Sequence, residues 1–174
     1  MAAVVLAAGA ATRFGAPKQR LLLPRVLERL RQAPVDEIVV VAGAYPLEAE
    51  EARVVHCPDW EQGPGASLRC GLAALGADVV AAVVCLADGP NLSPEAIRRV
   101  LHSWRAGAGE VVAASYEGER GHPVVVGRAR WNAVPDEGAR PLGAVLVPCD
   151  DVGAPGDIDR PHDLQRHEAS PGDG

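Results

Sequence analysis

The sequence predicts an α/β fold in which a mostly parallel β-sheet carries helices on both faces, with antiparallel additions in the C-terminal half. Short apolar runs recur at residues 2–7, 38–42, 79–86 and 111–114, and helix-like segments separate them. These runs lack the polar alternation of half-exposed strands, so we expect them to be buried on both faces of a parallel sheet. The composition agrees, because 48% of the residues are hydrophobic but only 3% are aromatic, which suits a sheet closely covered by helices.

Three segments between and after these runs are predicted to be helices. The clearest, over residues 93–107, opens with a serine that can cap it and a proline at its first position. Residues 67–76 and 25–33 are expected to form the other two, each with apolar residues at helical spacing. Beyond residue 115 the rhythm changes, and we expect the runs at 124–126 and 144–147 to form the antiparallel additions.

The length and composition favour one soluble domain. A chain of 174 residues can bury a sizeable core, and we expect residues 1–168 to fold as one unit and the polar residues 169–174 to form a disordered tail. The apolar N-terminal run lacks a preceding positive charge and is too short to cross a membrane. The four cysteines lie far apart without a CxxC pair, so we expect reduced thiols in a cytoplasmic protein with no membrane partner.

The charge balance constrains the ligands. The net charge is −6 and no basic stripe is visible, which argues against nucleic acid as a partner. An acidic surface repels free nucleotides at long range, so a phosphate site needs a local concentration of backbone N–H groups, Arg and Lys. The sequence therefore predicts a short basic loop if the ligand is a nucleotide.

Residues 6–18 form such a loop directly after the first apolar run. Gly9 permits a sharp turn at the carboxyl end of a strand and lets phosphate oxygens approach backbone N–H groups, while Arg13 and Lys18 can neutralise a triphosphate. Five residues separate Gly9 from Gly15, a spacing that fits neither the dinucleotide fingerprint nor the P-loop. By spacing alone, an ordinary strand-to-helix turn with incidental charges explains the loop equally well.

The loop fills every fixed position of the pattern L-x-x-G-x-x-x-R-x-G-x-x-K. In this it resembles the nucleotidyltransferases that make molybdenum cofactor dinucleotides and activate sugars. Later segments, in the same order as in that group, are Gly63-Pro-Gly-Ala-Ser67-Leu68, Leu86-Ala-Asp88-Gly-Pro90, Gly121-His122-Pro123, Gly138-Ala-Arg140 and Asp157-Ile-Asp159. Over nearly its whole length the chain resembles the molybdenum cofactor cytidylyltransferase (MocA-like) branch of the MobA-like NTP transferase family. The resemblance implies a single-domain, Rossmann-like nucleotidyltransferase fold.

The resemblance also implies a donor site. It assigns catalytic roles to Arg13, Lys18 and Asp88. Ser67 can equally be a helix cap, and Gln62 and Arg69 are further candidates for nucleotide contact. The residues implied to bind the nucleotide are Leu6, Ala7, Ala8, Gly9, Arg13, Gly15, Lys18, Gly63 and Ser67.

Two carboxylates are implied to bind Mg²⁺. Asp88 follows the apolar run 81–87, which would place it at the carboxyl edge of a parallel sheet beside the glycine loop. Asp159 is the implied second ligand. A turn role for Asp88, within Asp-Gly-Pro, and a helix-cap role for Asp159 remain open alternatives.

His122 and Arg140 are implied to contact the acceptor. His122 could donate a hydrogen bond to a phosphate or pterin group, and Arg140 could meet a phosphate. The plainer alternatives are a surface loop histidine and a solvated salt bridge between Arg140 and Glu137.

The implied reaction is transfer of CMP from CTP to Mo-molybdopterin with release of pyrophosphate, and the product would pass to a molybdenum hydroxylase or its chaperone. Leu-Ala-Ala-Gly, in place of Leu-Ala-Gly-Gly, points to CTP over GTP by analogy. The acceptor side departs from the family pattern, with Gly89 where Gln is common and Pro135-Asp136 in place of Gly-Asp, and the segment after Lys18 is short.

Three other functions stay open. The first is transfer from a nucleotide such as GTP to another phosphorylated acceptor, for example a sugar phosphate. The second is an NAD(P)H-dependent oxidoreductase of the nicotine-blue type, which the missing ribose-binding acid and the glycine spacing argue against. The third is a nucleotide sensor or assembly partner of a molybdoenzyme, without turnover.

Overall fold

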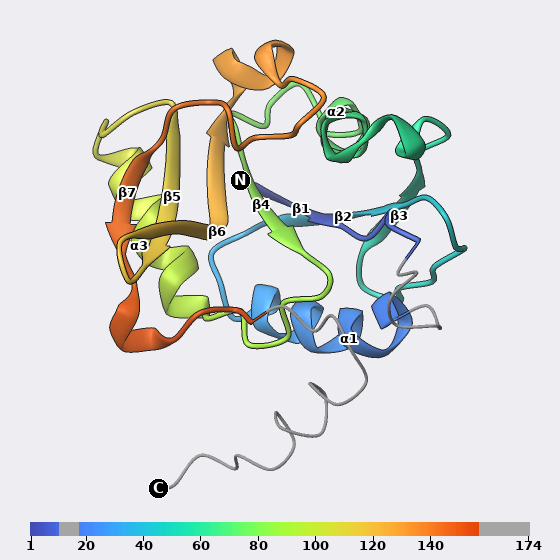
Figure 1. Cartoon of the computed structure of the whole chain (residues 1–174), viewed down its shortest axis with the longest axis horizontal. Helices are drawn as coiled ribbons and strands as arrows, with labels where there is room; N and C mark the ends of the chain where they lie inside the picture. Colours follow the sequence, from blue (N-terminus) through green and yellow to red (C-terminus); the bar gives the residue numbers. More distant parts are fainter. Residues whose placement is uncertain (11–17, 157–174) are drawn as a thin grey trace, which may run out of the picture.

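A seven-stranded β-sheet forms the centre of the computed structural model, which describes residues 1–10 and 18–156 (Figure 1). In spatial order the strands run β3-β2-β1-β4-β6-β5-β7. Their bounds are β1 (Ala2–Leu6), β2 (Glu37–Ala42), β3 (Arg53–His56), β4 (Ala81–Leu86), β5 (Val111–Tyr116), β6 (Glu119–Gly127) and β7 (Val145–Pro148).

The strand directions confirm a mostly parallel sheet with an antiparallel insertion in its C-terminal half. Strands β1 to β4 are mutually parallel, whereas β6 runs antiparallel to both β4 and β5. The expectation that residues 144–147 form a second antiparallel addition was wrong, because β7 pairs parallel to β5, and a short apolar run does not by itself encode its direction. Strand β3 was not predicted, because its two valines are too short an apolar run to stand out between the exposed Arg53 and His56.

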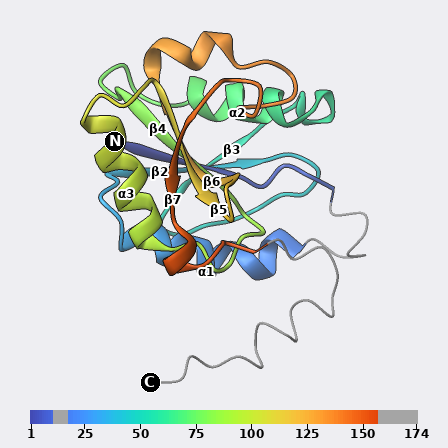
Figure 2. The same cartoon turned by 60° about the vertical axis from the view of Figure 1, so that its left-hand side comes forward.

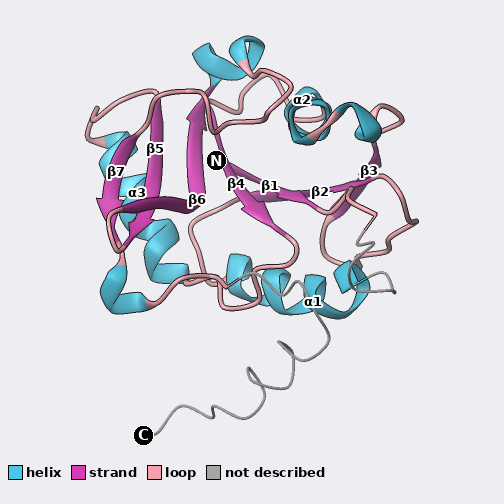
Figure 3. Cartoon of the chain, viewed as in Figure 1, coloured by secondary structure: helices cyan, strands magenta, loops and turns pink. Residues whose placement is uncertain are grey.

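Helices cover both faces of the sheet, as predicted (Figure 3). They are α1 (Lys18–Arg31), α2 (Pro64–Ala73) and α3 (Pro94–Arg105), and short 3₁₀ turns occur at η1 (Trp60–Gln62), η2 (Arg128–Ala133) and η3 (Asp150–Val152). Apolar side chains of α1 and α3 share one core layer, while α2 and η2 enclose the other. The result is three layers, with the sheet in the middle.

Helix α3 begins as predicted, but α1 and α2 both begin earlier than predicted. At the start of α3, the Ser93 hydroxyl accepts a hydrogen bond from the Ala96 N–H at 3.3 Å. Helix α2 begins earlier, after Gly63, so Ser67 lies inside the helix and does not cap it. Helix α1 begins at Lys18 and continues through Pro24, because the buried apolar side chains before and after this proline outweigh its cost to the helix.

The four cysteines are free thiols, in agreement with their scattered positions. Within residues 1–10 and 18–156, none of the helices has the length and apolar character needed to cross a membrane.

Candidate functional site

Two loops meet where the neighbouring parallel strands β1 and β4 end. Leu6 is in register with Leu86, and the Ala87 N–H donates to the Leu6 carbonyl at 3.1 Å. Carboxyl ends of adjacent parallel strands are where open α/β sheets bind ligands. The glycine loop after β1 and Asp88 after β4 are therefore brought together, as the sequence predicted.

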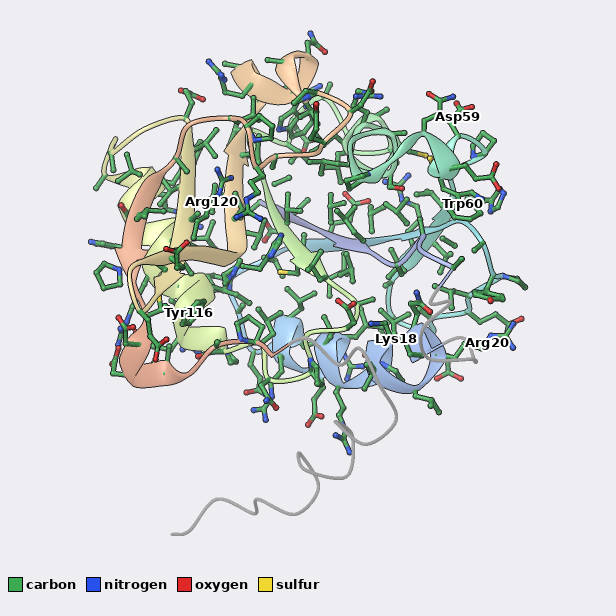
Figure 4. The ribbon with its side chains drawn as sticks, viewed as in Figure 1. Lys18, Arg20, Asp59, Trp60, Tyr116 and Arg120 are labelled. Atoms are coloured by element: carbon green, nitrogen blue, oxygen red, sulfur yellow. The ribbon has the colours of Figure 1, made fainter. Side chains whose placement is uncertain are left out.

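Lys18 and Asp88 form an ion pair at this edge. The Lys18 Nζ atom lies 3.0 Å from Asp88 Oδ2, and the exposed fractions of the two side chains are 8% and 28%. Lys18 is the first residue of α1, and Figure 4 shows it on the side of that helix that faces the sheet. The ammonium is thus nearly buried, and the carboxylate beside it is partly open to solvent.

Backbone carbonyls of the glycine loop are held by side chains that the sequence analysis did not single out. Gln19 Nε2 donates to the Gly9 carbonyl at 2.7 Å, and the Tyr45 hydroxyl donates to the Ala10 carbonyl at 3.0 Å. The Ala8 carbonyl accepts from the Ala44 N–H at 3.0 Å. These contacts fix the start of the loop, whereas Gly9 itself stays exposed. Neither Gln19 nor Tyr45 belongs to a recognisable motif, so only the fold reveals them.

A cavity of about 530 Å³ opens next to the loop after β4, whose Gly89 lines it, whereas Lys18 and Asp88 do not. Its walls are mostly apolar and come from β1, β4, β6 and α2, while its polar groups come from the end of β5, the start of β6 and the segment after η2. The apolar lining includes Leu6, Leu68, Val84, Leu86, Leu92 and Val124, and the polar lining includes Tyr116, Arg120, His122, Glu137 and Arg140. The structure thus places both expected acceptor residues, His122 and Arg140, on one cavity next to the ion pair.

The expected donor residues on α2 stand behind this cavity. Pro64 and Leu68 line it, but Gly63 and Ser67 do not. Gly63 has a φ of +119° and precedes the helix, and Ser67 is only 5% exposed. Ser67 is therefore packed inside the protein, whereas Gly63 is half-buried and Pro64 is exposed.

His122 is partly buried in the cavity wall, and its carbonyl accepts a hydrogen bond from the Tyr116 hydroxyl at 3.0 Å. Burial, together with the positive charge of Arg120, lowers the imidazole pKa to about 4, and the negative charge of Asp88 offsets only part of this. The ring is therefore neutral near pH 7, so it can donate or accept a hydrogen bond but contributes no positive charge.

Arg120 supports the loop that carries Arg140. Its guanidinium donates to the carbonyls of Ala139, Arg140 and Leu142 at 3.0, 3.0 and 2.8 Å, and Figure 4 shows it between β6 and β4. Burial and the nearby Arg140 lower the Arg120 pKa from its ordinary value. Arg140 itself is exposed, and within the described part of the chain no salt bridge joins it to Glu137. Arg120 was missed because an arginine in a hairpin turn carries no motif.

A strap of residues 153–156 closes the cavity against the loop after β4. The Asn91 N–H donates to the Pro155 carbonyl at 3.0 Å, and a Cβ at Gly89 would stand 3.0 Å from the Pro155 Cβ. Glycine at position 89, where the family resemblance leads us to expect Gln, therefore lets the strap pass close to Asp88. Four expected residues, Arg13, Gly15, Asp157 and Asp159, lie outside the described residues.

A family model for the MobA-like NTP transferase domain matches residues 3–146, which is most of the chain. The protein belongs to this family. It is accordingly a nucleotidyltransferase. No curated protein sequence matches the chain significantly.

Solved structures of other proteins share this fold. Rv0371c of Mycobacterium tuberculosis is 26% identical over 95% of this chain and 96% of its own, with a TM-score of 0.80. Rv0371c in complex with manganese superposes with a TM-score of 0.77, also at 26% identity over 95% and 96% of the two chains. A nucleotidyl transferase from Methanothermobacter is 22% identical over 95% and 94% of the two chains, with a TM-score of 0.70, and shows the fold alone.

Proposed function

We propose that this MobA-like protein transfers CMP from CTP to the terminal phosphate of Mo-molybdopterin and releases pyrophosphate. The observation that carries the proposal is the Lys18–Asp88 pair at 3.0 Å, set at the joint carboxyl ends of β1 and β4 and beside the cavity that His122 and Arg140 line. A cation suited to phosphate and a carboxylate suited to a metal ion thereby meet near a pocket large enough for an organic acceptor, although neither side chain lines that pocket.

The donor set at this edge fits a divalent metal ion, for which we propose Mg²⁺. Within residues 1–10 and 18–156, no three His, Cys, Asp or Glu side chains cluster into a ligand group. Mg²⁺ does not need one, because it commonly takes one or two carboxylates and completes its shell with water and substrate phosphates. Asp88 would supply the first carboxylate, and we propose Asp159 as the second. When bound, the ion would offset the negative charge of the triphosphate and of the leaving pyrophosphate.

The protein's own groups account for the remaining steps by positioning and charge. A phosphate oxygen of the acceptor attacks the α-phosphorus of the nucleotide, and the bond from that phosphorus to the bridging oxygen of pyrophosphate breaks. Lys18, together with Arg13 by our proposal, stabilises the negative charge that builds up on the phosphate oxygens. The backbone at residues 8 and 9, with Gly15 and the chain at Gly63 before α2, holds the nucleotide.

The acceptor side follows from the lining of the cavity. The apolar walls accept the ring system of a pterin, and Arg140 at the rim attracts its phosphate. His122 contributes a neutral hydrogen bond, since the lowered pKa keeps its imidazole uncharged. The attacking phosphate is already ionised at neutral pH, so none of these groups has to act as a general base. We propose that the product then passes to a molybdenum hydroxylase or its chaperone.

The proposal is tested by a thermal-shift titration with CTP, GTP, ATP, UTP and NADPH, each with Mg²⁺, with Mn²⁺ and with neither ion. A ligand at a hundred times its dissociation constant stabilises the native state by about 2.7 kcal/mol, which shifts the melting temperature of a domain this size by several degrees. We expect the largest shift with CTP and Mg²⁺. A metal-dependent shift with GTP alone would keep the transferase but replace the donor, and a shift with NADPH alone would favour a reductase.

A further inference from the structure

The segment at residues 134–140, which follows η2, lies against the first turns of α2, and both views of the chain show the two side by side (Figures 1 and 2). The Gly65 N–H donates to the Asp136 carbonyl at 2.8 Å. A Cβ at Gly65 would stand only 1.8 Å from the Pro135 carbonyl oxygen, and one at Gly63 would stand 2.9 Å from the Asp136 carbonyl oxygen. The two backbones therefore touch, and glycine is needed for the approach.

Arg69 joins the same two elements through its side chain. From α2, its Nη1 atom donates to the Val134 carbonyl at 2.9 Å and its Nη2 atom donates to Asp136 Oδ1 at 2.8 Å. The exposed fractions of the Arg69 and Asp136 side chains are 37% and 74%, so the ion pair by itself adds little stability. Two bonds from a planar guanidinium instead fix both the position and the orientation of the segment.

Both elements that Arg69 joins continue into the cavity beside Asp88. Pro64 and Leu68 line it from α2, and residues 137–140 line it from the clasped segment. Arg69 is not itself part of the lining. A shift of the segment relative to α2 would consequently change the width of the cavity and the orientation of the backbone at Gly63 and Gly65.

We propose that Arg69 is a positioning residue, a clasp that holds the donor side of the site, at the start of α2, at a fixed spacing from the acceptor side, at residues 137–140. This rests on the proposed nucleotidyl transfer and refines it. Arg69 commits one N–H of each terminal nitrogen atom to the 134–136 segment. A site whose loops are held in place binds its ligand without the cost of ordering them first.

The test measures the dissociation constant of CTP with Mg²⁺ by calorimetry for the wild type, Arg69→Ala, Arg69→Lys, Asp136→Ala and the Arg69→Ala/Asp136→Ala double variant. Arg53→Ala is the matched control, because Arg53 likewise donates to one carboxylate, Glu37 at 2.6 Å, and to one carbonyl, that of Ala74. It lies on β3, away from the cavity lining.

We expect Arg69→Ala to weaken CTP binding by about 5- to 10-fold, from the loss of two partly exposed hydrogen bonds, and Arg69→Lys to fall between it and the wild type. The double variant should bind no more weakly than Arg69→Ala, and Arg53→Ala should stay within about twofold of the wild type. Hydrogen exchange at the Gly65 amide should accelerate in Arg69→Ala and not in Arg53→Ala.

Equal CTP affinity in the wild type and Arg69→Ala would overturn the clasp and leave the transferase proposal standing. An equal loss in Arg69→Ala and Arg53→Ala would overturn it too, because general destabilisation would then explain both. If the wild type binds no nucleoside triphosphate, the proposed function fails first, and the clasp fails with it.

Discussion

The ammonium of Lys18 lies 3.0 Å from the carboxylate of Asp88, so each residue neutralises the other in the ligand-free protein. When a triphosphate binds with its metal ion, the contact between Lys18 and Asp88 would be replaced by two others: a phosphate group would pair with Lys18, and the metal ion would bind Asp88. The pair places a compensating negative charge beside the nearly buried ammonium of Lys18. It also holds both groups at the edge of the sheet before the ligand arrives, which lowers the cost of organising the site.

Lys18→Ala should reduce the turnover number for pyrophosphate release by about 100- to 1000-fold, the range seen when one group that stabilises developing charge is removed. Arg20→Ala is the matched control, because Arg20 lies on the same helix but is exposed and donates to the Pro46 carbonyl. It should retain near-wild-type turnover. Near-normal release by Lys18→Ala would remove Lys18 from the site.

Asp88→Asn should abolish the dependence of CTP binding on Mg²⁺ and leave the fold intact. Asparagine keeps the size of the side chain but has no negative charge for the cation. The control is Asp78→Asn, since Asp78 is exposed and precedes β4, at the opposite end of the strand from Asp88. Calorimetric titration of CTP at several Mg²⁺ concentrations, with circular dichroism as the check on folding, decides the question. Persistent metal dependence in Asp88→Asn would place the metal elsewhere.

Much of the fold follows from the sequence because long apolar runs and helix caps are local signals. The cap at Ser93 and the apolar strand β4 are examples, and both stand where they were predicted. Helix α1 was predicted to start at residue 25, after Pro24, but it starts at Lys18 and continues through this proline, because the residues on both sides of the proline are buried. Tertiary packing decides such cases, and a single sequence does not display it.

The site shows the same division. The position of Asp88 beside the glycine loop was predictable, because both follow strands of a parallel sheet and the carboxyl ends of such strands lie at one edge; the ion pair with Lys18 was not predicted. Ser67 was expected to contact the nucleotide and is instead buried inside α2. Gln19 and Arg120 act on backbone carbonyls, and which carbonyls lie within their reach depends on the folded loops. The sequence therefore did not reveal the residues that hold the loops in place, whereas it did reveal the charged residues of the site.

His122 should make the metal-free protein less stable on the acid side of neutrality. Its folded-state pKa is about 4, below the ordinary 6.5, so the unfolded chain binds this proton more readily between those two values. The stabilisation from the neutral imidazole is thus complete above pH 6.5 and is lost as the pH falls toward 4. Chemical denaturation across this range should give a steeper fall for the wild type than for His122→Asn. Asp88 and Arg120, whose charges act on His122, are present in both proteins, so their own titration does not distinguish them. Identical stability profiles of the two proteins against pH would therefore contradict the lowered His122 pKa.

Gly65→Ala should destabilise the protein and weaken CTP binding, because the new Cβ would stand 1.8 Å from the Pro135 carbonyl oxygen. Backbone cannot yield there without moving the segment away from α2, and we expect a loss of about 1–3 kcal/mol in the free energy of unfolding. Gly143→Ala is the control, since a Cβ at that position would meet nothing within 4 Å. Equal stability of the two variants would show that the contact is loose in solution.

Cys57→Ser should leave activity close to that of the wild type, whereas Cys85→Ser should lower stability. The Cys57 thiol donates to the Ala66 carbonyl at 3.7 Å, and a serine hydroxyl keeps a donor at that position.

Cys85 is fully buried, burial raises its thiol pKa to about 12, and it has no hydrogen-bond partner in the described part of the chain. A serine hydroxyl at this position would be buried without a hydrogen-bond partner, which lowers the free energy of unfolding by about 1–3 kcal/mol. Thermal denaturation should therefore show a melting temperature several degrees lower for Cys85→Ser than for Cys57→Ser. A large loss of turnover in a stable Cys57→Ser variant would instead point to a thiol in the reaction, because neither packing nor the hydrogen bond would explain it.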